Sequence, residues 1–98
     1  MEAVYVFLGE QGAAKLTWAI KTELESAGFR RIRVVRSEWG FRIEADGLFL
    51  SVFPHPEERG VWGVELKPPG GLGRLLARAR RMKALDAVQR AVRAQGLG

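Results

Sequence analysis

Apolar and polar positions follow three different patterns along this chain, and each pattern predicts a different element. Residues 3–8 are apolar at every position and rich in β-branched and aromatic side chains, which predicts a buried strand. Between residues 12 and 27 apolar residues recur at steps of three and four, which predicts an amphipathic helix. The Gly28 that follows favours a left-handed helix cap, with Phe29 folded back on Leu24.

Residues 30–67 alternate between apolar and polar positions, which predicts antiparallel strands joined by short turns. Asp46 and Gly47 give the strongest turn signal, because a two-residue type I′ turn needs a positive φ at both central residues. We expect helices to cover one face of this sheet. With a further loop at residues 37–40, the register places eleven apolar residues on that face: Ile32, Val34, Phe41, Ile43, Ala45, Leu48, Leu50, Val52, Trp62, Val64 and Leu66.

A Pro-Pro-Gly-Gly segment at residues 68–71 ends the strand pattern, and a long helix is predicted from about residue 72 to residue 95. A chain of 98 residues has material for one core. We therefore predict a single α+β domain over residues 1–98. Its antiparallel sheet of about four to five strands is covered on one face by two helices, in the order β-α-β-β-β-β-α.

The predicted last helix carries two apolar stripes that do not share a face. Leu85, Val88 and Val92 lie well around the cylinder from the stripe of the first half, at about 100° per residue. Either the helix kinks near residues 83–85, or one half packs on its own domain while the other meets a partner. We favour a homodimer through Leu85, Val88 and Val92, with the exposed-face Trp18 as a further contact. The first-half stripe holds Leu72, Leu75, Leu76, Ala79 and Met82.

Positive charge is concentrated in the C-terminal segment. Residues 68–98 carry seven basic residues and a single acidic one, Asp86, in a chain whose net charge is +5. Cations spaced a turn apart reach successive phosphates of a nucleic acid, and arginine binds each in bidentate fashion. Alternatively, these cations form a solvated helix face with no partner, or they reflect the arginine-rich composition of a GC-rich and heat-adapted source. The candidate contacts are Arg74, Arg78, Arg80, Arg81 and Lys83.

The sheet face opposite the helices is predicted to carry Arg33, Arg42, Phe49 and Phe53. Aromatic rings beside arginines on an open sheet are typical of platforms that stack single-stranded bases. Alternatively, the N-terminal strand, a loop or a second subunit covers this face, and the two phenylalanines are then interface anchors.

The order helix, antiparallel strands and basic helix over residues 12–95 resembles the layout of double-stranded RNA-binding domains. The chain departs from the family where the lysine-rich start of that helix is replaced by Arg74 and Leu75. It also has additional predicted strands at residues 3–8 and 61–67.

No pattern of catalytic or metal-binding residues is found. His55 is the single histidine and the chain has no cysteine, so a usual zinc site cannot be assembled. His55 lies between two prolines, a placement typical of a structural or exposed residue. We expect no enzymatic activity and no cofactor. The apolar run at residues 3–8 is too short for a signal peptide or a membrane span, so we expect a cytoplasmic protein without membrane contact.

These patterns favour a small non-enzymatic binding module that contacts nucleic acid, RNA rather than DNA, through the basic last helix. The alternative is a protein-interaction or homo-oligomeric assembly module with no nucleic-acid role, whose basic patch meets an acidic protein.

Overall fold

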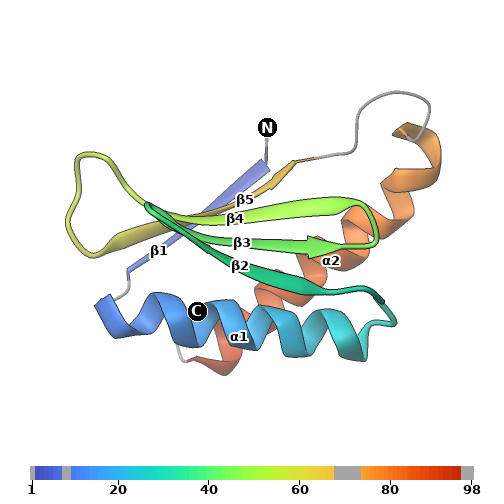
Figure 1. Cartoon of the computed structure of the whole chain (residues 1–98), viewed down its shortest axis with the longest axis horizontal. Helices are drawn as coiled ribbons and strands as arrows, with labels where there is room; N and C mark the ends of the chain where they lie inside the picture. The colour runs from blue at the N-terminus through green and yellow to red at the C-terminus, as the bar shows by residue number, and fades with distance from the viewer. Residues whose placement is uncertain (1, 8–9, 68–73, 96–98) are drawn as a thin grey trace.

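The computed structural model describes residues 2–7, 10–67 and 74–95, and within them the side chains of Tyr5, 12–66 and 78–95. Two helices lie on one side of an antiparallel sheet (Figure 1), so the α+β class is confirmed. The elements are β1 (Glu2–Phe7), α1 (Glu10–Ser26), β2 (Arg33–Ser37), β3 (Gly40–Ala45), β4 (Leu48–Pro54), β5 (Val61–Lys67) and α2 (Arg74–Ala94).

The five strands are ordered β1-β5-β4-β3-β2 across the sheet, and every neighbouring pair is antiparallel. The sequence left the place of the N-terminal strand open. In the structure β1 extends the sheet beside β5, with Tyr5 opposite Gly63. It therefore does not cover the face that points away from the helices.

The β3–β4 hairpin has the predicted turn and register. Asp46 and Gly47 have φ angles of 47° and 85°, as a type I′ turn requires. The buried side of the hairpin follows from the two-residue period of the pleat. The cross-strand pairs are Phe41 with Val52, Ile43 with Leu50 and Ala45 with Leu48, and all of these except the half-buried Phe41 are fully buried.

The end of α1 also confirms the sequence-based prediction. Gly28 has a φ of 95°, and the backbone N–H of Phe29 donates to the carbonyl oxygen of Leu24 at 3.0 Å. Phe29 is buried against the core, where it closes the end of the helix. Thr17, a polar residue inside the same core, satisfies its hydroxyl group by donating to the carbonyl oxygen of Ala13 at 2.7 Å.

The structure corrects the predicted partner interface on α2. Val88 and Val92 are buried in the protein's own core, and Leu85 is half-buried against it. The reason is that α2 uses small residues to approach α1 and the sheet, so the buried stripe is centred on alanines rather than on the large apolar residues. These alanines, all fully buried, are Ala84, Ala87 and Ala91.

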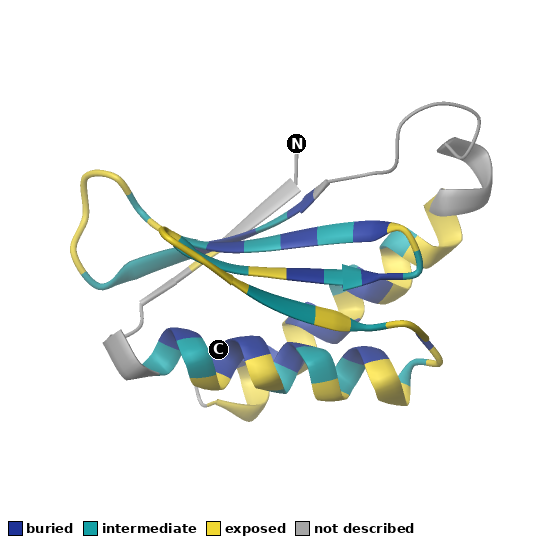
Figure 2. Ribbon diagram, in the orientation of Figure 1, coloured by how far each residue is buried: buried dark blue, intermediate teal, exposed yellow. Residues whose placement is uncertain are grey.

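Among the described side chains of α2, the exposed stretch is therefore residues 78–83, before the segment that was predicted to meet a partner. Residues 78–80, 82 and 83 are exposed and Arg81 is half-buried. Met82, from the predicted first-half stripe, is 60% exposed. Figure 2 shows exposed surface (yellow) on this part of α2 and buried surface (dark blue) further along, where the helix approaches α1. The side chains of Leu72, Leu75 and Leu76 lie outside those that the structure describes.

Candidate binding surfaces

The first candidate surface is formed by the cations of α2. Arg78, Arg80 and Lys83 are exposed, and none of them forms an ion pair with any described residue. Arg81 is half-buried and engaged in a contact of its own. The side chain of Arg74 lies outside the described ones. Three of the five cations predicted as contacts on this helix are thus exposed.

These cations do not share one face of the helix. At about 100° per residue, Arg78 and Arg80 point in directions about 160° apart, while Lys83 lies about 60° from Arg80. Because this part of α2 is exposed on nearly every side, cations surround it. By the same spacing Arg78 lies about 40° from Arg74 and about 60° from Arg81, so α2 carries basic residues on two sides: these three on one, Arg80 and Lys83 on the other.

Several other cations are tied to carboxylates. Glu23 accepts a hydrogen bond from Arg90 Nε at 3.0 Å, which joins α2 to α1. Lys21 Nζ lies 3.4 Å from Glu25 and Arg42 lies 3.2 Å from Glu44. The contrast shows that the exposed stretch of α2 carries positive charge that the described residues do not neutralise.

The open sheet face holds the predicted aromatic residues, but their rings are not equally accessible. The Arg42 guanidinium carbon lies 4.4 Å from the centre of the Phe49 ring and covers it. The Phe53 ring packs edge-on against Tyr5, with centroids 6.3 Å apart. Phe49 and Phe53 are half-buried, whereas Tyr5 is 55% exposed. Tyr5, which the sequence analysis placed in a buried strand, is therefore the most accessible ring of this group.

His55 has a structural role in the β4–β5 loop. Its Nδ1 accepts the backbone N–H groups of Glu57 and Glu58, each at 3.1 Å. Its own backbone N–H donates to Val61 at 2.8 Å, and its ring lies 5.7 Å from the ring of Tyr5. Within the described residues, no three histidine, cysteine or acidic side chains are grouped so that they could hold a metal ion.

A hollow that sequence reasoning missed lies between α1 and the β2–β3 hairpin. Its volume is about 780 Å³. Small residues on α1, Ala13 and Ala14, together with Gly40 leave the space, while all three tryptophans of the chain line it. Trp18 is 54% exposed and Trp39 is 73% exposed. The third tryptophan is Trp62, and the remaining lining residues are Val34, Arg36, Ser37, Glu38, Phe41 and Pro54.

The sequence alone could have predicted part of this tryptophan hollow. Trp18 and Trp39 are conspicuous as exposed tryptophans, but they are 21 positions apart and lie in different elements. Trp62 was predicted on the helix-covered face, where the structure places it half-buried. Nothing in the periodicity indicates that the three converge, because convergence depends on how α1 crosses the end of the hairpin.

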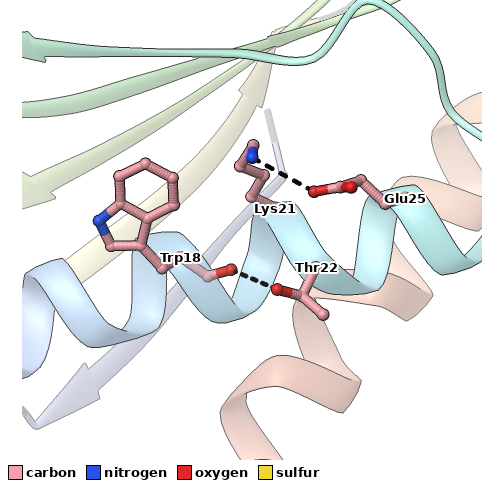
Figure 3. Close-up of polar contacts among 4 residues, drawn as sticks. All are labelled: Trp18, Lys21, Thr22 and Glu25. Atoms are coloured by element: carbon pink, nitrogen blue, oxygen red, sulfur yellow. Dashed lines mark hydrogen bonds and ion pairs between the residues drawn. The ribbon is translucent and has the colours of Figure 1, made fainter.

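A second, smaller hollow of about 280 Å³ lies beside the other half of α1. It is lined by Lys21 and Glu25 of α1 and by residues 29–32 of the segment that leads into β2. Figure 3 shows Trp18, Lys21 and Glu25 on the same side of α1, with Thr22 on another. Lys21 Nζ lies 5.2 Å from the Trp18 ring centre, so this side of the helix links the two hollows.

The chain matches no protein-family model, and no curated protein or solved structure matches it either. The similarity in layout to double-stranded RNA-binding domains therefore remains a similarity of element order. Among the described residues, no helix combines the length and the apolar character needed to cross a membrane.

Proposed function

We propose that this protein is a small non-enzymatic binding module that contacts nucleic acid through the first half of α2. The observation that carries the proposal is the charge of residues 78–83, which include four cations and no acidic residue. Three of these cations are exposed and form no ion pair with a described residue. Phosphate groups supply the opposite charge at a similar spacing, and their release of counterions provides most of the affinity.

The placement of the cations favours a ligand that passes around the helix. Arg78 and Arg80 point to different sides of α2, so they reach phosphates that a straight row along one face could not engage. A folded or single-stranded RNA offers phosphates in several directions, and its unpaired bases can stack on exposed rings. The open sheet face supplies Tyr5 and Phe53 for this contact. RNA therefore remains the preferred ligand in the proposal.

The experiment that tests the proposal is a salt titration of binding. Fluorescence anisotropy of a labelled 20-nucleotide RNA and of a 20-base-pair DNA gives the affinity at several salt concentrations. The triple variant R78Q/R80Q/K83Q should bind RNA more weakly, and the slope of log K against log salt should fall by about 2, since each phosphate contact contributes about 0.7.

The matched control is R30Q/R36Q/R59Q, which removes the same charge from exposed arginines of β2, of the segment before it and of the β4–β5 loop. This variant should keep the salt dependence of the wild-type protein. Equal losses in the two triple variants would show that only net charge matters, and unchanged binding by R78Q/R80Q/K83Q would refute the proposal.

A further inference from the structure

Strand β2 ends the sheet, and its outer edge has no neighbour among the described residues. It pairs with β3 alone. A two-residue turn joins Ser37 to Gly40, so these two residues form a hydrogen-bonded pair. Hydrogen-bonded and non-hydrogen-bonded pairs then alternate along the two antiparallel strands. Arg33, Val35 and Ser37 therefore bond towards β3. The backbone N–H and C=O groups of Val34 and Arg36 point to the outer edge, where they can accept a further strand.

Both hollows lie between α1 and the helix-facing side of the sheet, and each reaches β2 or the segment before it. The tryptophan hollow lies next to Val34 and Arg36, and the smaller hollow lies next to Arg30, Arg31 and Ile32. From Ile32 to Arg36 a strand covers about 13 Å, at about 3.3 Å per residue. A peptide of about five extended residues would span both hollows and point alternate side chains into them.

The charge of this edge selects the occupant. Residues 30–36 include four arginines and no acidic residue. Asp46 offsets part of this charge, because its carboxylate accepts the backbone N–H of Arg30 at 2.8 Å and lies 3.7 Å from Arg31 Nε. Pairing with β2 of a second copy would oppose arginine to arginine, which is unfavourable. Glu25 and Glu38, which also line the hollows, are outnumbered by the four arginines and Lys21, so an acidic strand is complementary to this edge.

We propose that the seam between β2 and α1 binds an acidic peptide segment in extended conformation. The segment adds a strand to β2 and inserts an aromatic or large aliphatic side chain between Trp18 and Trp39. Backbone hydrogen bonds to Val34 and Arg36 give affinity, and the tryptophan hollow selects the side chain. This site is separate from the cations of α2 on which the nucleic-acid proposal rests.

A displayed library of random ten-residue peptides tests the proposal without assuming a sequence. Selection on the wild-type protein should enrich peptides with several aspartates or glutamates and with apolar residues at alternate positions. Enrichment of basic or patternless peptides, or no enrichment at all, would overturn the proposal.

The edge itself is tested by V34P, which removes the one N–H that the added strand would use at this position. The N–H of Val34 does not bond to β3, so proline is tolerated there as on other edge strands. We expect synthetic peptides from the selection to bind V34P at least tenfold more weakly, about 1.4 kcal/mol, and V34T nearly as well as wild type. Circular dichroism checks that both variants fold.

Two measurements on the wild-type protein keep the test independent of V34P. Methylation of the peptide's backbone nitrogens should abolish binding, because a methylated nitrogen cannot donate to the edge of β2. NMR amide shifts on peptide addition should be largest at residues 32–37. The proposal would be refuted if methylated peptides bound equally well, or if the amide shifts were centred on residues 78–83. It would also be refuted if RNA displaced the peptide from residues 32–37. If R78Q/R80Q/K83Q bound RNA as well as the wild-type protein does, the nucleic-acid proposal would fail, but the peptide-binding result would still stand.

Discussion

Three glycines of the sheet are required for three different physical reasons. A Cβ at Gly40 would overlap the carbonyl oxygen of Val52, which belongs to the neighbouring backbone. A Cβ at Gly63 would lie 2.6 Å from Phe53 Cζ and 3.0 Å from Tyr5 Cε1, so the two rings close over this position. Gly47 has open space around its Cα but a φ of 85°. The sequence indicated only the last of these, because a turn motif is local and the other contacts depend on strand pairing.

These differences predict a ranking of alanine substitutions. G40A should cost about 3 kcal/mol of unfolding free energy, because no side-chain rotation can relieve an overlap with backbone. G47A should cost about 1 kcal/mol from the left-handed conformation alone, and G63A about 1 kcal/mol, since aromatic rings can shift. Urea denaturation measures all three. In the background F53L the cost of G63A should shrink, and an unchanged cost there would show that the Phe53 ring is not the obstacle.

At the scale of elements, the sequence predicted what depends on local period and turn chemistry. The β3–β4 register and the end of α1 follow from Asp46, Gly47 and Gly28, and the structure confirms them. The orientation of α2 could not be read in this way. Its large apolar residues, Leu85 among them, predicted a contact face for a partner. The helix instead packs through fully buried alanines, which contribute little to a hydrophobic pattern in the sequence.

The alanine stripe predicts which contacts hold α2 in place. A87L should destabilise the protein by about 2 kcal/mol, because the added atoms would force α2 away from α1 and the sheet. A79L places the same side chain on the exposed stretch of the helix and should change stability by less than about 0.5 kcal/mol. Urea titrations of both variants compare them directly.

The ion pair between α1 and α2 is expected to matter less than the stripe. The side chains of Arg90 and Glu23 are 47% and 29% exposed, so solvent screens their attraction and E23Q should cost less than about 1 kcal/mol. A larger loss in E23Q than in A87L would mean that charge, not close packing, joins the two helices.

At the scale of the whole molecule, the concentration of positive charge near the C-terminus was visible in the sequence, but its distribution in space was not. The fold exposes Arg78, Arg80 and Lys83 on α2 and pairs Arg90 with α1. It also creates a second basic region at the edge strand β2, remote in sequence from the first. Composition alone could not separate these two regions, because their separation follows from the place of β2 in the sheet.

The burial of Val88 determines whether replacing it by aspartate would break a dimer or unfold the protein. A valine on a subunit interface could be replaced by aspartate with loss of the dimer alone, whereas a valine in the core cannot be charged without unfolding. Val88 is 1% exposed, so V88D should abolish the cooperative urea transition and the dispersed NMR spectrum. Met82, 60% exposed on the same helix, provides the control, and M82D should fold with nearly unchanged stability. A folded, monomeric V88D protein would instead indicate that the second half of α2 is a subunit interface.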